Sequence, residues 1–467
     1  TPYLIHTLLN ELDSFCLLIT KDSQQAYSIE SSLKFFSDST LQSNEVLVFP
    51  DWETLPYDTF SPHEDIISQR LETLNTLPKL NKGILILPLN TLLHRLPPKT
   101  FIERHSLSLK ISQRIDLGAY RSSLESVGYR HVETVYEHGE YTIRGAIFDI
   151  FPMGSELPVR VELFDDEIES LRTFDPETQR SKQKLNTLQI LPAHEFPWDS
   201  ESRLSFRNKW LEQFPNSASS SPLIRDIKDG IKPHGIEYYS PLFFDDMDTL
   251  FDYLPKNTLV ITPPEASDNL DAIWTEINKR YEDRRHDIQR PILPPRNLFL
   301  STDEIFSNIK SFPRITLTSE RIDSSPGKLN LPFTTLQDVS VDDRATDPIS
   351  KLKTAIDGFG GHTIIVAESA GRREVLNDLF KQYSLKHNTA SDWNDCIKLE
   401  HQTVVTIGGL SHGFIDENAA FQIITETELF GQRVIQSRRR KKASDNAELV
   451  VKNLTELTIG SPVVHID

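Results

Sequence analysis

A central segment of extended runs constrains the fold of this chain more than any other part of the sequence. Between residues 137 and 179, three runs rich in aromatic and β-branched residues are separated by a Pro-Met-Gly-Ser and by an Asp-Asp-Glu sequence. Such runs between turn-forming residues are typical of β-strands joined by short turns. The segment therefore predicts an antiparallel meander with strands over residues 141–151, 159–164 and 168–174.

The second of these runs has two chemically different faces. Its odd-numbered positions are aliphatic, whereas its even-numbered positions carry Arg160, Glu162 and Phe164. Side chains alternate across a strand, so the aliphatic side is predicted to be buried and the other side to face solvent. Arg and aromatic residues are enriched where proteins bind partners. The pattern alone leaves two interpretations open, a contact surface or a solvated face with one exposed aromatic residue.

Charge and length limit the possible functions. A chain of 467 residues is too long for one core and predicts three or four domains. Its 50 basic and 68 acidic residues give a net charge of -18, which repels nucleic acid unless a local basic patch overrides it. The sequence contains one dense run of basic residues, which predicts either a solvated linker or a contact with a polyanion. The run consists of Arg438, Arg439, Arg440, Lys441 and Lys442.

Cysteine usage and hydropathy indicate the compartment. Cys16 and Cys396 are far apart in the sequence and form no metal-binding pair, which favours a reducing environment. No signal peptide is recognisable, and no apolar run approaches the ~20 residues of a membrane span. We therefore expect a soluble, cytoplasmic protein without a membrane partner. Because the chain begins without Met and ends directly after a strand-like run, we also expect it to be a piece of a longer protein.

Apolar runs alternate with helical patterns on both sides of the meander. Runs at residues 15–20, 45–49 and 83–88 alternate with helix-like segments and predict a parallel sheet with both faces covered. Ser61, Pro62 and Glu64 predict a capping box at the start of one helix. Further runs near Thr363, Thr403 and Ala420 predict a second, smaller α/β unit. Outside these units, helices are predicted over 112–127, 208–214 and 268–284, and a strand over 258–262.

The candidate catalytic and metal-binding motifs in the sequence lack the residues, spacing or context that their chemistry requires. The phosphate loop Gly-x-x-x-x-Gly-Lys-[Ser/Thr] does not occur, and the one Gly-Lys pair, Gly327-Lys328, lies in the wrong context. The sequence Gly409-Leu-Ser-His-Gly matches a hydrolase elbow, but no helical pattern follows it, so a turn between strands is predicted. His131 and His138 lie near acidic residues without metal-ligand spacing, and we expect them to be ordinary surface or core histidines.

Six segments of the chain carry a resemblance to known proteins. They are residues 51–71, 127–132, 144–175, 191–197, 235–244 and 453–465. In this order they are similar to segments of the bacterial transcription-repair coupling factors, the Mfd family, and residues 144–175 also resemble the middle domain of the nucleotide-excision-repair protein UvrB. The long DNA-clamping hairpin that UvrB-like proteins insert has no room between residues 64 and 89.

This resemblance implies an α/β multidomain fold. We expect a degenerate helicase-like parallel-sheet domain of the P-loop type without Walker motifs, with an inserted small antiparallel β domain, followed by a second small α/β domain. The predicted boundaries are 1–106 and 193–320 for the two parts of the first domain, 107–192 for the inserted UvrA-binding domain, 321–342 for a linker, 343–436 for the small α/β domain, 437–453 for the basic linker and 454–467 for the start of an RNA-polymerase-interacting domain.

The resemblance also implies a function. The whole protein would release stalled RNA polymerase at DNA lesions and recruit UvrA, using ATP and magnesium in carboxy-terminal motor domains that act on DNA. This part would be a regulatory, non-catalytic module without cofactor or metal, and the role of residues 343–436 stays open. The positions that match the family's UvrA-contacting surface are Arg144, Arg160 and Phe164. We expect all three to be replaceable without unfolding. The alternative is a UvrB-like, damage-binding, helicase-related enzyme.

Overall fold

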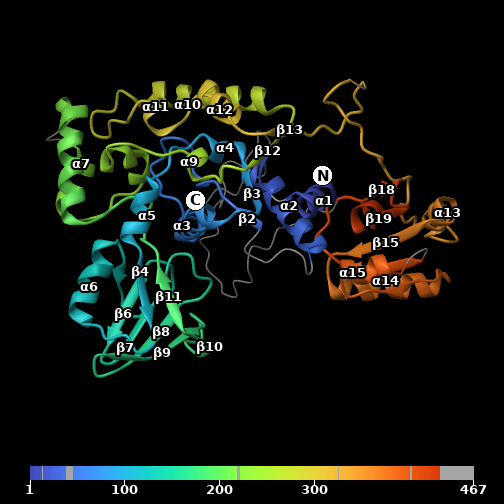
Figure 1. Ribbon diagram of the computed structural model, residues 1–467, viewed down its shortest axis with the longest axis horizontal. Helices are drawn as coiled ribbons and strands as arrows, with labels where there is room; N and C mark the ends of the chain where they lie inside the picture. The colour runs from blue at the N-terminus through green and yellow to red at the C-terminus, as the bar shows by residue number, and fades with distance from the viewer. Residues whose placement is uncertain (13, 38–45, 218–220, 324, 400–401, 432–467) are drawn as a thin grey trace.

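The structure is a computed structural model that describes residues 1–12, 14–37, 46–217, 221–323, 325–399 and 402–431. The basic run at 438–442 and the segment 454–467 lie outside the described residues. The structure contains three units, the second of which is inserted in the sequence of the first, and each has a main sheet of its own (Figure 1). Among the described helices, none is long and apolar enough to cross a membrane.

The first unit is an α/β domain on a five-stranded sheet. All its strands are parallel, in the order β13-β12-β1-β3-β2, as the alternation of apolar runs and helices predicted. Side chains of α1 and α2 pack on one face of the sheet, and those of α3 and α10 on the other. The strands are β1 (Phe15–Thr20), β2 (Val46–Val48), β3 (Gly83–Pro88), β12 (Leu259–Thr262) and β13 (Arg314–Thr316), and these helices are α1 (Pro2–Glu11), α2 (Ser23–Phe36), α3 (Glu64–Thr76) and α10 (Ala266–Arg284).

The remaining helices of this unit are shorter. The predicted helices at 208–214 and 268–284 are present within α7 and α10, which confirms both. The others are α4 (Leu89–Leu92), α5 (Lys99–His105), α7 (Ser200–Gln213), α8 (Pro222–Lys228), α9 (Leu250–Tyr253), α11 (Pro295–Leu298) and α12 (Thr302–Ile309), with 3-10 helices η2 (Leu77–Lys79), η3 (Pro215–Ser217) and η4 (Ile236–Phe243).

The predicted capping box at Ser61 is wrong. Helix α3 begins at Glu64, and its N-cap is His63, whose Nδ1 accepts a hydrogen bond from the Asp65 N–H at 3.2 Å. The Ser61 hydroxyl is used elsewhere, because it donates to Glu237 Oε2 at 2.8 Å and accepts from the Gly235 N–H at 2.9 Å. A contact distant in sequence has replaced the local one.

The second unit is the inserted domain. Its six-stranded sheet has the order β10-β9-β8-β7-β6-β5, with helix α6 beside it and a separate two-stranded pair, β4 and β11, at its base (Figure 1). The helix occupies part of the predicted range 112–127. The elements are β4 (Leu107–Lys110), α6 (Leu117–Ser126), β5 (Arg130–His131), β6 (Glu140–Arg144), β7 (Ile147–Ile150), β8 (Val159–Phe164), β9 (Glu167–Phe174), β10 (Ser181–Leu185) and β11 (Thr187–Ile190).

The meander is confirmed, but its first run is two strands and not one. Strand β6 ends at Arg144 and β7 begins at Ile147, with a tight turn at Gly145 and Ala146. Gly145 has a φ of 62°, in the left-handed region that glycine enters at little cost. A positive φ at the first of two turn residues is the geometry of a type II′ hairpin. The prediction of a single strand over 141–151 is therefore wrong.

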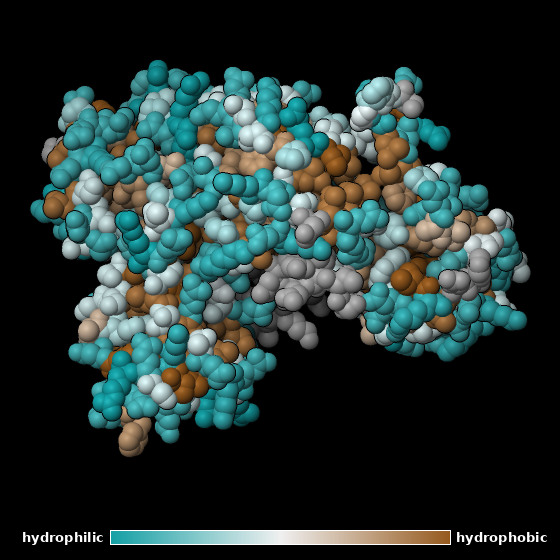
Figure 2. All heavy atoms as spheres, viewed as in Figure 1, coloured by the Kyte–Doolittle hydropathy of each residue, from teal (hydrophilic) through white to brown (hydrophobic). Residues whose placement is uncertain are grey.

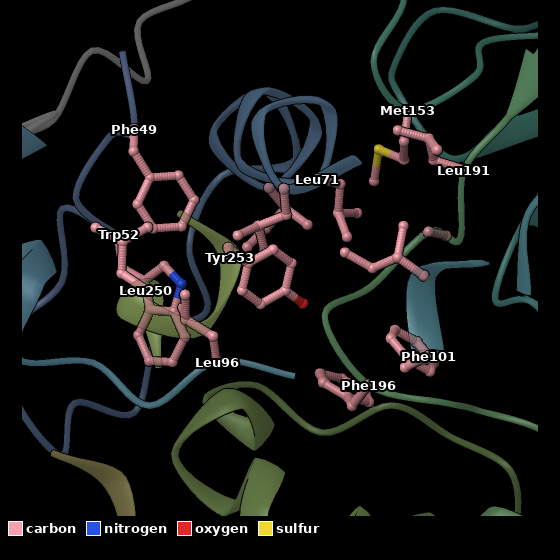
Figure 3. Close-up of a cluster of buried hydrophobic side chains, with 14 of the residues drawn as sticks. Phe49, Trp52, Leu71, Leu96, Phe101, Met153, Leu191, Phe196, Leu250 and Tyr253 are labelled. Atoms are coloured by element: carbon pink, nitrogen blue, oxygen red, sulfur yellow. The ribbon is translucent and has the colours of Figure 1, made fainter. Parts of the chain in front are cut away.

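The inserted domain shares its core with the first unit. Figure 3 shows Met153 and Leu191, from the base of the inserted domain, near Leu71 of α3. A polar contact lies beside this core: buried His138 contacts Asp65 Oδ1 through Nδ1 and the Ser155 carbonyl through Nε2, both at 2.8 Å. His138 is thus a core histidine that joins the two units.

The third unit is a small α/β domain. Its sheet has the order β14-β18-β19-β15-β17-β16, and the three predicted strands near 363, 403 and 420 are present as β15, β17 and β19. The short strand β14 lies within residues 321–342, which were predicted to form a linker. The elements are β14 (Phe333–Thr334), α13 (Ser350–Phe359), β15 (His362–Ala367), α14 (Ala370–Gln382), β16 (Asn388–Thr389), α15 (Trp393–Lys398), β17 (Thr403–Ile407), β18 (Phe414–Asp416), β19 (Phe421–Thr425) and α16 (Glu426–Phe430).

The glycine-rich turn at 408–413 joins β17 to β18, as predicted, and it also contacts helix α2 of the first unit. The Ser32 hydroxyl donates to the Gly409 carbonyl at 3.1 Å, and a side chain at Gly409 would collide with Ser31. Aromatic rings continue this contact, including Phe36 and Trp393 with centroids 4.9 Å apart. The first and third units are therefore packed together through α2.

Candidate functional site

The outer face of the inserted sheet is the candidate site. Residues directly opposite one another in an antiparallel sheet lie on the same face. The register places the side chains of four strands, β6 to β9, on this outer face. They are Arg144, Ile147, Asp149, Arg160, Glu162, Phe164, Ser170 and Arg172, and together we call them the outer face.

The strand alternation predicted for β8 is confirmed. Val159, Val161 and Leu163 are buried, whereas Phe164 is 76% exposed. On neighbouring strands, Ile147 is 38% exposed and the Arg144 side chain 53%. Figure 2 shows hydrophobic areas within the largely hydrophilic surface of this part of the molecule. The outer face therefore combines apolar surface with at least one accessible guanidinium, as partner-binding surfaces do.

Two of the predicted site residues meet at a buried carboxylate. Arg160 donates from Nε to Asp149 Oδ1 at 2.7 Å and from Nη2 to Oδ2 at 2.9 Å. Arg144 donates from Nη2 to Oδ2 of the same carboxylate at 3.0 Å. The Asp149 side chain is only 1% exposed. Charge-assisted pairs of this kind are strong and directional, so Asp149 fixes both guanidinium groups relative to the sheet.

Arg160 is more enclosed than the strand pattern predicted. Its side chain is 17% exposed, its Nη1 donates to the Gln179 carbonyl at 3.3 Å, and its guanidinium lies 4.8 Å from the centre of the Phe174 ring. The hydrogen bond to Asp149 raises the pKa of Arg160 above its usual value. Arg160 thus makes contacts within the domain, whereas Arg144 and Phe164 are largely exposed, and the replaceability of all three stays a prediction.

A second polar cluster lies beside the first. The Ser170 hydroxyl donates to Glu162 Oε2 at 2.5 Å, and Arg172 Nη2 lies 3.9 Å from the same oxygen. The pairing of β8 with β9 shifts between Glu162 and Leu163, so that Phe164 lies opposite Glu167 beside the hairpin end. Phe164 consequently projects at the margin of the face, while the charged groups occupy its centre.

Sequence reasoning missed Asp149 and Ile147. Both lie on β7, which was merged with β6 in the predicted first run. The signal that could have separated the strands is the Gly145-Ala146 pair, because glycine at the first turn position permits a two-residue hairpin.

A metal centre is not among the alternatives to the outer face in the described residues. Across the part of the chain that the structure describes, no three His, Cys, Asp or Glu side chains are grouped so as to hold a metal ion. His138 is buried between Asp65 and Ser155, and His131 is exposed on β5. The outer face, with its exposed apolar side chains and accessible guanidinium, is suited to binding a partner surface.

Comparisons with known proteins match two regions of the chain to described domains. A model described as the UvrB interaction domain matches residues 107–196, which include the whole outer face. A second model, described as the MFD D3 domain, matches residues 356–429 in the third unit.

Curated relatives match nearly the whole chain. The transcription-repair-coupling factor of Escherichia coli is 39% identical over 452 residues, which cover 97% of this chain and 39% of the relative. That of Haemophilus influenzae is 39% identical over 99% of this chain and 40% of the relative, and that of Staphylococcus epidermidis 27% identical over 96% and 39%. The chain thus spans about two fifths of the length of these relatives.

Proposed function

Because this chain is a homologue of the transcription-repair-coupling factors, we propose that it is the non-catalytic, UvrA-recruiting module of such a protein. The observation that carries the proposal is the position of the outer face within the region that matches the UvrB interaction domain. Arg144 and Phe164 supply its accessible charge and apolar area. Arg160 pairs with Asp149, the carboxylate that also pairs with Arg144.

The proposal places this module in a larger protein. The whole protein would contact stalled RNA polymerase through a domain that begins near residue 454, and would use ATP and magnesium in motor domains on DNA to release the polymerase. Both cysteines, Cys16 and Cys396, are buried and form no disulfide, which supports a reducing compartment such as the cytoplasm. The Arg438–Lys442 run is at most a weak, salt-dependent contact with a polyanion.

The residues of the two α/β units do not fit a bound nucleotide. In a P-loop enzyme the phosphates lie at the N-terminus of the helix that follows the first strand. Here only Lys21 and Asp22 separate β1 from α2, and Asp22 Oδ1 accepts the Gln25 N–H at 2.8 Å. The chain's own carboxylate thus uses the donor that a phosphate would need.

The third unit has a comparable arrangement. Glu426, which is 5% exposed, accepts the Glu368 N–H at 2.9 Å and the Arg372 Nε–H at 2.6 Å near the start of α14. At both helix N-termini a carboxylate of the chain itself occupies the donors. This supports the interpretation as a binding module and not as a UvrB-like enzyme.

Binding of purified UvrA to the chain tests the proposal. Arg144→Ala and Phe164→Ala should each weaken the affinity at least several-fold without lowering the Tm, because these side chains are exposed and hot-spot truncations typically cost ~2 kcal/mol or more. Arg160→Ala should weaken binding and also lower the Tm, because it leaves Asp149 partly unpaired.

Two variants serve as matched controls. Arg121→Ala removes a 52% exposed guanidinium on α6, in the same domain but not on the strands of the outer face, and Phe60→Ala removes a 63% exposed ring in the first unit. Both should bind UvrA like the wild type. Wild-type affinity in Arg144→Ala and Phe164→Ala together would show that UvrA does not use this face.

A further inference from the structure

We propose that Asp149 is a positioning residue of the outer face, which holds Arg144 ready to engage an acidic group of the partner and fixes Arg160 as part of the scaffold. The inference rests on the proposed function, since it explains how the same face is prepared for binding. It assigns different roles to two arginines that a sequence pattern treats as equivalent.

Asp149 has the geometry of an organising residue. It lies in the middle of β7, directly opposite Arg160 on β8 and Thr142 on β6. Both of its carboxylate oxygens are bonded, with Oδ1 accepting from Arg160 and Oδ2 accepting from both Arg160 and Arg144. A carboxylate buried to this degree is stabilised by such donors, and it restricts in turn where they can lie.

Arg160 has little capacity left for a partner. Its Nε, Nη1 and Nη2 all donate within the domain, and one face of its guanidinium lies over Phe174. Two of its five N–H donors remain, but the side chain is only 17% exposed, so a partner carboxylate has little access to them. Arg160 therefore acts by holding Asp149, and not as the group that the partner contacts.

Arg144 has the opposite character. It makes a single hydrogen bond to Asp149 and keeps half of its side chain exposed. A guanidinium carries five N–H donors, so four remain for a partner. Ile147, directly opposite Arg144 across the hairpin, is partly exposed and supplies adjoining apolar surface. This pair fits a partner surface that offers a carboxylate beside an apolar side chain.

Pre-positioning has a measurable consequence. A long side chain that is already restrained loses less conformational entropy on binding than one that must be ordered. If Asp149 acts through Arg144, removing the Asp149 carboxylate must weaken partner binding only while Arg144 is present. If Asp149 only stabilises the sheet, the two substitutions must act independently.

A double-mutant cycle on the full chain tests this, with UvrA as the probe. Asp149→Asn keeps the side-chain volume and removes the charge. We expect it to weaken UvrA binding several-fold, and we expect Asp149→Asn with Arg144→Ala to bind no more weakly than Arg144→Ala alone. Losses that multiply in the double variant would overturn the positioning role. Asp116→Asn is the matched control, because it removes a carboxylate from the N-cap of α6 in the same domain, where Asn can keep the cap, and it should bind normally.

Stability and binding are separated by measuring both. Affinities are compared well below the Tm of each variant, where all are folded. Should Asp149→Asn fail to fold, Asp149→Glu retains the charge but displaces the carboxylate, and the same cycle with Arg144→Ala applies. Normal binding by Arg144→Ala would overturn the positioning role, and normal binding by Phe164→Ala as well would contradict the proposed function itself. Weak binding by Arg144→Ala with normal binding by the Asp149 variant would contradict only the role of Asp149.

Discussion

The buried carboxyl group of Glu237 makes the first unit sensitive to pH. Glu237 lies in η4 with 5% exposure, and burial raises its pKa to about 7 although Lys232 acts in the opposite direction. A raised pKa in the folded state means that the protonated form stabilises the fold. This contribution is complete below the unfolded value near 4.5 and is lost as the pH rises through about 7.

Glu237→Gln should therefore raise the Tm at pH 8 and leave it nearly unchanged at pH 4.5. A shift from 4.5 to about 7 corresponds to an upper limit of roughly 3 kcal/mol at alkaline pH. The neutral amide still accepts the Ser61 hydroxyl through its oxygen. Thermal unfolding of both proteins from pH 4.5 to 8 measures the effect, and parallel curves at every pH would refute it.

The limits of sequence reasoning are visible at single residues of the outer face. Alternation along β8 was sufficient to predict that Arg160 and Phe164 share a face. It could not place Asp149, because a two-residue turn reverses the alternation. On one continuous strand Asp149 would lie on the side of Tyr141, which is buried, whereas the turn brings it to the side of Arg144. One misassigned turn thus conceals the central residue of the face.

The β6–β7 hairpin depends on that turn. Gly145 has a φ of 62° and nothing lies within 4 Å of where its Cβ would be, so backbone conformation alone limits the residue there. Gly145→Val should lower the free energy of unfolding by roughly 1–2 kcal/mol, the cost of the left-handed conformation for an L-residue. Gly145→Asn should cost less, because Asn tolerates this region. Urea unfolding compares the two, and equal stability would contradict the role of the turn.

Longer elements were predicted better than shorter ones. The strands β1, β3 and β15 are continuous apolar runs buried on both faces, and the sequence identifies such runs directly. The two-residue strand β14 has no pattern of its own and exists because it pairs with β18. The start of α3 was misplaced for a related reason, since Ser61 is held by Gly235 and Glu237 from another part of the chain.

At the scale of the whole molecule, the closed helix N-termini predict that the chain does not bind ATP. The Asp22 carboxylate accepts from the Gln25 N–H in α2. The Glu426 carboxylate accepts from the Glu368 N–H before α14 and from the Arg372 side chain within it. Isothermal titration with magnesium and ATP at millimolar concentration should give no saturable heat. Micromolar affinity in a preparation free of contaminating ATPases would contradict the prediction and favour a UvrB-like enzyme. A known P-loop ATPase is the positive control.

The packing between the first and third units could not be predicted from the sequence. Ser32 and Gly409 are 377 positions apart in the chain, and neither belongs to a pattern that indicates its partner. The aromatic residues of the junction, such as Phe36 and Trp393, resemble ordinary core residues when read locally. Units can be delimited from composition and periodicity, but their docking depends on side chains that only the folded chain brings together.

The pairing of β4 with β11 has an evolutionary consequence. Leu107 and Ile190, where the chain enters and leaves the inserted domain, lie directly opposite each other, so their Cα atoms are about 5 Å apart. A short peptide link could span this gap and leave the host sheet continuous. One genetic exchange of residues 107–190 could therefore replace the outer face, provided that the new domain keeps the contacts of Met153 and His138 with α3.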